Sequence, residues 1–229
     1  MIKERIAQIR KNIDRICHSS GRSSDSIVIV AVTKYTTVEN IKEAVRAGIT
    51  DIGENRIQDA AKKFSELDGK VVNLKRHMIG HLQTNKAKDA VELFDMVQSV
   101  DSVKIAKAID KESEKIHKVM DVLLQVNSSL EERKSGIHPD QLMNVLDEVS
   151  ALKNIRICGL MTIGPLTENR NSIRSCFQLT KNLFDEAGKR LSGQKNSAMK
   201  ILSMGMTNDY DIALECGANM VRIGSAIFA

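Results

Sequence analysis

A lysine directly follows a short apolar run near the start of the chain. Residues 27–32 read Ile-Val-Ile-Val-Ala-Val and are followed by Thr33 and Lys34. A β-branched run of this length predicts a strand buried on both faces, and a lysine at its carboxyl end lies where α/β barrels place their chemistry. Such a lysine can be simply solvated, bind phosphate, pair with a carboxylate or form an imine with a carbonyl. The imine requires a neutral amine, which burial beneath apolar barrel walls would favour by lowering the lysine pKa.

Two segments near the other end of the chain combine glycine and hydroxyl residues directly after short apolar runs. They are residues 202–209 and residues 221–225. The loops after strands seven and eight of an α/β barrel are its usual phosphate site, because glycine lets the backbone approach the anion closely. Ordinary turn and cap chemistry is the alternative, but two adjacent loops opposite a lysine favour the phosphate site. The candidate phosphate-binding residues are Ser203, Gly205, Thr207, Gly224 and Ser225.

Arg222 lies in an otherwise apolar segment. A buried guanidinium keeps its proton, so it needs a carboxylate, a phosphate or a ring nitrogen as acceptor. Arg222, Lys34 and a phosphate site together suit pyridoxal 5′-phosphate (PLP), with the aldehyde on Lys34 and the pyridine nitrogen at Arg222. An arginine there would leave the ring nitrogen unprotonated and weaken the ring as an electron sink. The alternative is an ion pair between Arg222 and a barrel acid such as Glu54.

Eight strand-then-helix units must position these residues. With right-handed crossovers they predict a single-domain (β/α)₈ TIM-type barrel of the α/β class over residues 1–229. An open doubly wound sheet is the alternative. The predicted strands are 27–32, 51–53, 76–80, 94–100, 120–126, 155–163, 200–204 and 219–223. The predicted helices are 2–18, 38–47, 58–67, 103–117, 139–152, 173–187 and 207–216.

The first predicted helix precedes the barrel. Isoleucines recur along it at helical spacing, which predicts an amphipathic helix. No full eighth helix follows the last predicted strand, so we expect this extra N-terminal helix to help cover that part of the barrel. Residues 192–197 predict a surface loop.

Composition excludes several classes of protein. The net charge is +5, but basic and acidic residues are interleaved, which favours a phosphorylated small molecule over nucleic acid. No apolar stretch is long enough for a membrane span, and the N-terminal residues do not resemble a signal peptide, so we expect a cytoplasmic protein without membrane contact. The four cysteines are scattered, which predicts reduced thiols in the core. His77 and His81 lack the context of a metal site, and we expect His77 to form hydrogen bonds inside the barrel.

The sequence resembles the pyridoxal phosphate homeostasis proteins of the YggS/PROSC type, which are similar to the barrel domain of alanine racemase. The resemblance covers residues 27–228, and its blocks are 31–34, 53–55 with Gln58, 77–86, 134–136, 159–161, 203–207 and 221–224. It implies that Lys34 carries the imine, that Arg222 faces the pyridine nitrogen, and that Ser203, Thr207, Gly224 and Ser225 hold phosphate. Asn55, Met78 and Gly205 complete the expected cofactor-binding set. Arg56 stands where an aromatic residue is expected, and the usual proline shortly after the lysine is absent.

These observations favour a protein that buffers or delivers PLP and performs no catalysis. Its partners would be PLP and apo PLP-dependent enzymes as acceptors, and we expect a monomer. Lys134 is a candidate second amine for the aldehyde in transit. A small amino-acid racemase is the first alternative, but no second domain remains to supply an opposing base. The second is a lysine-imine aldolase, for which Asn55, Asn127 and Ser99 at neighbouring strand ends supply no acid or base.

Overall fold

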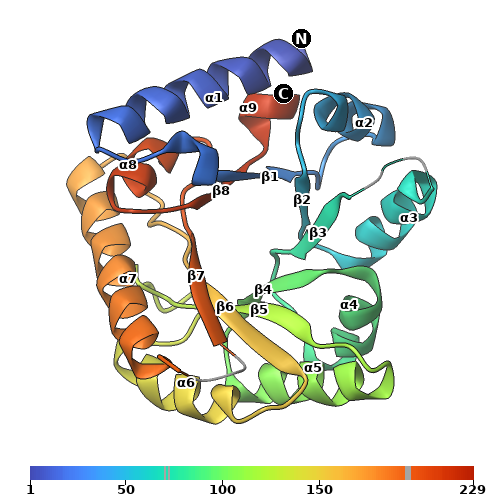
Figure 1. Cartoon of the computed structure of the whole chain (residues 1–229), viewed down its shortest axis with the longest axis vertical. Helices are drawn as coiled ribbons and strands as arrows, with labels where there is room; N and C mark the ends of the chain where they lie inside the picture. Colours follow the sequence, from blue (N-terminus) through green and yellow to red (C-terminus); the bar gives the residue numbers. More distant parts are fainter. Residues whose placement is uncertain (70, 72, 194–196) are drawn as a thin grey trace.

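Eight parallel strands close into a barrel in their sequence order (Figure 1). The computed structural model describes residues 1–69, 71, 73–193 and 197–229. β8 pairs with β1, with Val28 opposite Met220 and Ala31 opposite Ile223. This closure confirms the predicted (β/α)₈ architecture and excludes the open doubly wound sheet. The strands are β1 (Val28–Val32), β2 (Asp51–Glu54), β3 (Lys75–Met78), β4 (Met96–Val100), β5 (Met120–Gln125), β6 (Ile155–Met161), β7 (Ser197–Ser203) and β8 (Met220–Ile223).

Helices surround the barrel and bury one apolar face each against it, as in α3, where Ile57, Ala60, Phe64 and Leu67 lie on one face. Such burial stabilises the fold by roughly 25 cal/mol per Å² of apolar surface. The helices are α1 (Ile2–Ser19), α2 (Val38–Arg46), α3 (Ile57–Leu67), α4 (Ala87–Leu93), α5 (Val103–Lys115), α6 (Leu142–Ser150), α7 (Arg170–Arg190), α8 (Tyr210–Glu215) and α9 (Ser225–Phe228).

The N-terminal helix covers the barrel where predicted. α1 packs against α2, α8 and α9, and all five of its isoleucines are buried. Arg5 donates a hydrogen bond to the carbonyl of Ile227 in α9, and Arg22 donates to the carbonyls of Leu214 and Ala218 around the end of α8. These bonds fix α1 and the turn after it to the segments on either side of β8.

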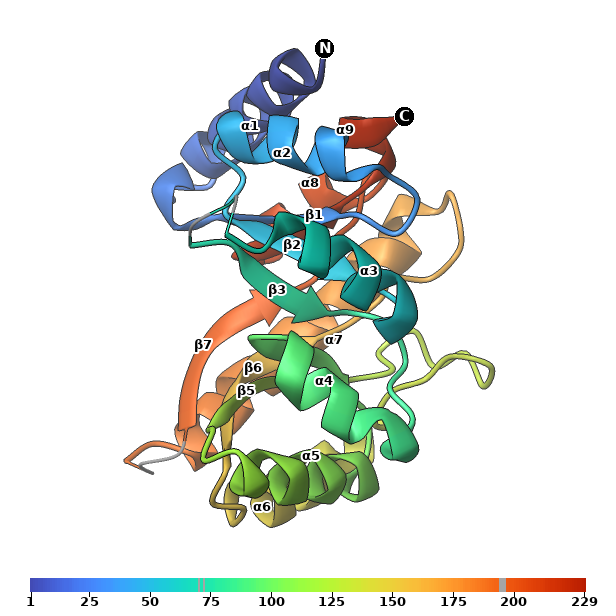
Figure 2. The ribbon, with the colours of Figure 1, turned by 90° about the vertical axis from the view of Figure 1, so that its right-hand side faces the viewer.

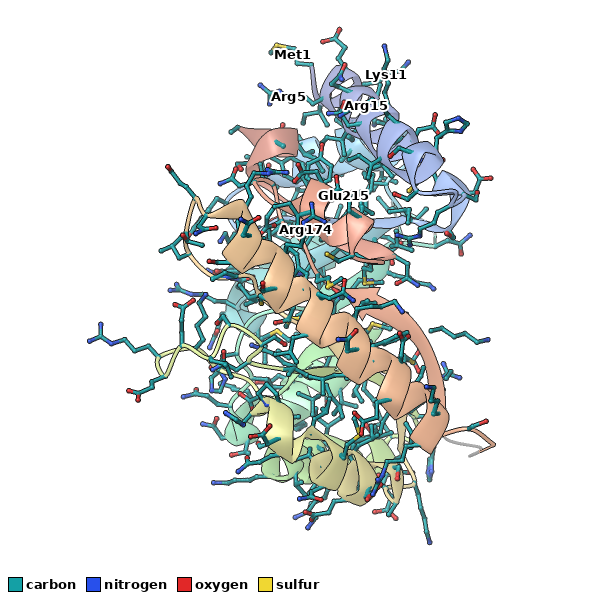
Figure 3. The ribbon with its side chains drawn as sticks, turned by 90° about the vertical axis from the view of Figure 1, so that its left-hand side faces the viewer. Met1, Arg5, Lys11, Arg15, Arg174 and Glu215 are labelled. Carbon is teal, nitrogen blue, oxygen red and sulfur yellow. The ribbon has the colours of Figure 1, made fainter. Side chains whose placement is uncertain are left out.

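Figure 3 views this flank of the molecule. Arg174 of α7 and Glu215 of α8 form an ion pair there, which joins two neighbouring helices. Lys11 and Arg15 of α1 are exposed and extend from the surface. The polar face of α1 is therefore solvated at these residues, as the amphipathic pattern predicts.

A few element boundaries differ from those predicted. The short helix α4 was not predicted, because it spans only seven residues and gives little periodic signal. β7 begins at Ser197, inside the predicted loop 192–197, of which residues 194–196 lie outside the described residues. α6 begins at Leu142 because a 3₁₀ turn, Pro139–Gln141, precedes it.

The carboxyl ends of the strands form the mouth of the barrel. In Figure 2 the loops after β5 and β6 project from the side toward which the arrows of β3 and β7 point. All four cysteines are free and buried, as predicted, and burial raises the pKa of Cys158 and Cys176 to about 11. None of the helices within the described residues is both long and apolar enough to cross a bilayer.

Candidate functional site

Lys34 lies two residues after the end of β1, at the mouth of the barrel. Its side chain is exposed, and Nζ lies 5.1 Å from the centre of the Tyr35 ring. Apolar burial, which would favour the neutral amine, is therefore absent at Lys34 in this conformation. An ammonium over an exposed aromatic ring gains only about 0.5–1 kcal/mol, and exposed side chains change rotamer rapidly. The long side chain is thus free to turn toward the mouth.

The loops after β7 and β8 meet at the mouth. Ser225 Oγ donates a hydrogen bond to Thr207 Oγ1 over 3.3 Å. Ser225 is exposed and Thr207 is half-buried, so a ligand can reach both hydroxyls. A hydroxyl can donate to a phosphate oxygen. The structure therefore brings together two of the residues predicted to hold phosphate.

Two glycines let these loops pack closely. Gly205 has φ of +94°, and a Cβ there would lie 2.9 Å from the Cα of Tyr210. At Gly224 a Cβ would lie 3.3 Å from the Cβ of Val32 in β1. A side chain at Gly205 would strain the backbone, and one at Gly224 would crowd the strand that leads to Lys34.

Arg222 in β8 is only 3 % exposed. Its Nη1 donates to Ser203 Oγ over 2.7 Å, and its Nη2 donates to the carbonyl oxygen of Thr162 over 2.7 Å. Both acceptors are neutral, and no carboxylate in the described part of the chain forms an ion pair with it. Burial lowers the pKa of Arg222 to about 10, although the charge of Asp209 acts in the opposite direction. The guanidinium therefore stays charged at neutral pH.

Glu54, the predicted alternative partner of Arg222, is paired elsewhere. Its Oε1 lies 2.7 Å from Nζ of Lys63 in α3 and accepts a hydrogen bond from the Thr33 hydroxyl over 2.7 Å. Lys63 also donates to the carbonyl oxygen of Thr33. The pairing of Glu54 with Arg222 is therefore wrong. The ion pair instead ties α3 to the residue that precedes Lys34.

Three other predicted cofactor residues differ in accessibility. Ser203 is the last residue of β7 and is fully buried; its hydroxyl donates to Gln98 Oε1 over 2.7 Å and accepts from Arg222. Met78 is buried in β3. Asn55 follows β2, is half-buried and lines a cavity. Asn55 thus opens on the mouth, whereas the Ser203 hydroxyl is already bonded on both sides.

The cavity beside Asn55 has a volume of about 240 Å³ and lies at the ends of β2, β3, β5 and β6. Lys134, the candidate second amine, lines it. Its Nζ lies 2.6 Å from Glu131 Oε1 and donates to the carbonyl oxygen of Gly164 over 2.9 Å. An amine held by a carboxylate and a carbonyl must leave both before it can receive an aldehyde.

His81 has the residue types of a hydrolytic triad beside it. Its Nδ1 lies 3.1 Å from Asp101 Oδ2 and 3.5 Å from Ser135 Oγ. In a triad the acid and the nucleophile contact opposite nitrogens of the imidazole ring. Because both contacts here involve Nδ1, the arrangement does not form a serine nucleophile.

His77 lies inside the barrel, as predicted. Its Nε2 is 2.8 Å from Asp51 Oδ1, and its Nδ1 is 3.1 Å from Gln98 Nε2. The sequence reasoning missed Gln98 and Thr162 as partners in this interior. A glutamine inside the predicted strand 94–100 was the available signal for Gln98, because a polar side chain in a strand buried on both faces needs a partner.

Comparison with known proteins agrees with this geometry. The alanine racemase N-terminal domain family matches residues 5–229. The pyridoxal phosphate homeostasis proteins of Aquifex aeolicus and Pasteurella multocida are 36% and 35% identical to this chain, over 98% and 99% of it and 96% of each relative. This chain belongs to their family. The resemblance inferred from the sequence blocks is thereby confirmed.

Solved structures of similar proteins support the assignment to the pyridoxal phosphate homeostasis family. PipY of Synechococcus elongatus, solved with PLP bound, is 32% identical with a TM-score of 0.87, and the match covers 100% of both chains. A protein of unknown function from Bifidobacterium adolescentis is 31% identical with a TM-score of 0.94, over 99% of this chain and 94% of that one. Alanine racemase of Clostridium difficile, at 17% identity and a TM-score of 0.71, matches over 95% of this chain and 54% of its own, which shows the shared fold.

The polar groups at the mouth come from several residue types. Among residues 1–69, 71, 73–193 and 197–229, no three His, Cys, Asp or Glu side chains gather as metal ligands. The groups at the mouth are an amine, hydroxyls, amides and a buried guanidinium. They suit an anionic organic ligand with a carbonyl.

The contact between Asp51 and His77 predicts a dependence of stability on pH. Although burial raises the pKa of Asp51, hydrogen bonds from His77 and Thr50 outweigh it, and the pKa lies below its ordinary value of 3.8. Such a carboxyl stabilises the fold above its unfolded pKa, and this contribution is lost as pH falls through the folded pKa. We expect Asp51→Asn to cost about 1 kcal/mol at neutral pH, the difference between a charged and a neutral acceptor. This cost should shrink as the pH falls below 3.8. Urea unfolding of both proteins at neutral pH and again below pH 3.8 measures the cost. A cost that stays constant between these conditions would contradict the prediction.

Proposed function

We propose that this chain binds PLP at the mouth of its barrel and serves PLP homeostasis, holding and releasing the cofactor without turning over amino acids. The observation that carries the proposal is Arg222, a buried guanidinium whose two hydrogen-bond acceptors in the described part of the chain are neutral. It lies at the same end of the barrel as Lys34 and the hydroxyl pair of Thr207 and Ser225. The names of the curated relatives and the PLP-bound structure of PipY support it.

The groups at the mouth match the parts of PLP one by one. When bound, PLP supplies an aldehyde that joins an amine as an imine and a ring that withdraws electrons. Lys34 would hold the aldehyde, and Arg222 would meet the pyridine nitrogen. The Ser203 hydroxyl would act through Arg222, from which it accepts a hydrogen bond. The phosphate would lie against Thr207, Ser225 and the backbone of Gly205 and Gly224, and Asn55 and Met78 would border the ring.

The chain's own residues favour storage over turnover. An arginine at the pyridine nitrogen leaves that nitrogen unprotonated and weakens electron withdrawal. Proton abstraction from carbon also needs a positioned base with water excluded. Tyr210 accepts a hydrogen bond from Asn12 of α1, and Tyr35 is 92 % exposed beside an exposed Lys34. Neither tyrosine is thus a shielded base over the mouth, which weighs against the racemase alternative.

The proposal predicts binding and transfer without amino-acid turnover. Purified protein loaded with PLP should show the near-visible band of an imine. In deuterated water with L-alanine or other amino acids it should produce negligible exchange at the α-carbon, and it should restore activity to an apo PLP-dependent enzyme. Rapid racemisation or exchange of any amino acid would favour the racemase. Absence of the band at stoichiometric PLP would overturn the proposal.

Arg222→Ala tests the contact with the pyridine nitrogen. A hydrogen bond to a charged group contributes roughly 1.5–3 kcal/mol, so we expect PLP to be retained about 10- to 100-fold less tightly. The covalent attachment should persist with an altered absorption spectrum. Arg156→Ala is the control, because Arg156 is bonded to Asp121 near the start of β6, at the other end of the barrel. If Arg222→Ala binds and absorbs like the parent, Arg222 does not face the ring.

A further inference from the structure

A continuous chain of hydrogen bonds crosses the barrel interior and ends at Arg222. It begins at Asp51 in β2, whose Oδ1 lies 2.8 Å from His77 Nε2 in β3. His77 Nδ1 lies 3.1 Å from Gln98 Nε2 in β4. Gln98 Oε1 accepts from Ser203 Oγ of β7 over 2.7 Å, and Ser203 Oγ accepts from Arg222 Nη1 of β8 over 2.7 Å. We call Asp51, His77, Gln98 and Ser203 the interior chain.

The interior chain is buried along its length. His77, Gln98 and Ser203 are each at most 1 % exposed, and Asp51 is 6 % exposed. Its members come from β2, β3, β4 and β7, and the bond from Gln98 to Ser203 joins strands that are not neighbours. Only side chains that point into the barrel can meet in this way. Polar groups cost free energy in such a place unless all are paired, so this set is bonded from end to end.

The bonds fix the direction of every member. Asp51, with its lowered pKa, is an acceptor, so His77 carries its proton on Nε2. Because the amide nitrogen of Gln98 can only donate, His77 Nδ1 is the acceptor in their contact. That nitrogen also donates to the sulfur of Met220 over 3.2 Å. A reversed amide would direct its oxygen at this sulfur, where no donor is available.

The bond between Gln98 and Ser203 decides whether the Ser203 hydroxyl can accept a hydrogen bond from Arg222. With Gln98 Oε1 directed at Ser203, the serine uses its own hydrogen on Gln98 and leaves a lone pair for Arg222 Nη1. A serine turned the other way would direct its hydrogen at a guanidinium N–H. The orientation of Arg222 therefore depends on the direction of every hydrogen bond in the interior chain, back to Asp51.

We propose that Asp51, His77, Gln98 and Ser203 are positioning residues that hold the Arg222 guanidinium in one orientation through a hydrogen-bond chain of fixed direction. For the pyridine nitrogen of PLP, this inference rests on the function proposed above. For the orientation of Arg222 it stands on the protein alone. None of the four residues needs to touch the cofactor, because each acts through the next.

The direction of the hydrogen bonds in the interior chain can be tested by NMR on the protein without cofactor. Long-range ¹H–¹⁵N spectra of the histidine rings should show His77 protonated at Nε2 and bare at Nδ1 near neutral pH. The guanidinium signals of Arg222 should be resolved and slow to exchange, and Ser203→Ala should broaden or merge them. A His77 protonated on both nitrogens, or Arg222 signals unchanged in Ser203→Ala, would overturn the proposal whether or not PLP binds.

The PLP-loaded protein tests the consequence for the ligand. Ser203→Ala and Gln98→Leu should keep the covalent attachment but shift the absorption maximum in the same direction as Arg222→Ala. They should also release PLP about tenfold faster, the effect of one lost hydrogen bond to a charged group. Ser99→Ala is the matched control, because Ser99 lies in β4 beside Gln98 and its buried hydroxyl has no partner among the described residues. It should behave like the parent.

The outcomes separate this inference from the proposed function. If Arg222→Ala changes the spectrum and neither Ser203→Ala nor Gln98→Leu does, the interior chain does not position Arg222, while PLP binding stands. If the parent forms no imine band, the proposed function fails. The NMR spectra of the protein without cofactor then still show whether the interior chain positions Arg222. If Gln98→Leu does not fold, Ser203→Ala carries the test, since it removes a single oxygen atom.

Discussion

Borohydride treatment of the PLP-loaded protein should fix the cofactor on the peptide that carries Lys34, and Lys34→Ala should lose the imine band completely. Lys34 lies two residues after the end of β1, and the loop after β8 packs against β1 through the close approach of Gly224 to Val32. The same loop carries Ser225, which bonds to Thr207. An aldehyde on a ligand whose phosphate lies at these hydroxyls is therefore presented to Lys34. Mass spectrometry of the reduced protein identifies the modified lysine.

Lys134→Ala is the matched control for this experiment. Lys134 is the other lysine considered at the mouth, and its Nζ is bonded to Glu131 and to the carbonyl of Gly164. This variant should keep the band at stoichiometric PLP. A label found on Lys134 with Lys34 unmodified would contradict the assignment, because Lys134 would then be the lysine that forms the imine.

The fold was largely predictable from the sequence because its signals are local. Buried parallel strands appear as β-branched runs, and their covering helices appear as apolar residues at helical spacing. The short helix α4 escaped prediction because the apolar residues Ala87, Ala90 and Val91 span little more than one turn. The predicted strand after it also began too early, at Phe94, which the structure places in the turn before β4.

The positions of the site residues were predictable, but their partners were not. Strand ends of a barrel converge, so Lys34, Thr207 and Ser225 could be assigned to one mouth. The predicted strand 200–204 already contained Ser203, but sequence does not show which face of a strand a side chain occupies. In the structure Ser203 is the last residue of β7 and its hydroxyl bonds to Gln98 inside the barrel. The exposure of Lys34 depends on tertiary packing, which the local sequence pattern does not show.

Lys63→Met should destabilise the folded protein by about 3 kcal/mol, the lower end of the cost of leaving one member of a buried ion pair unpaired. Glu54 is fully buried, and its Oε2 has no hydrogen-bond partner among the described residues. Its Oε1 relies on Lys63 and on the hydroxyl of Thr33. Lys63 is 16 % exposed at its side chain, so water replaces part of the lost interaction and the lower end applies. Urea unfolding gives the change in free energy.

Lys62→Met and a double variant complete this test. Lys62 is exposed beside Lys63, so its loss should change stability by no more than about 0.5 kcal/mol. Lys63→Met combined with Glu54→Gln removes both charges and should recover most of the loss, since a buried pair contributes little once neither charge remains. The single variant should also loosen the carbonyl of Thr33, to which Lys63 donates, and thereby slow the attachment of PLP at Lys34. If the double variant were as unstable as the single one, packing by the lysine stem would explain the loss, and the charge of Glu54 would not.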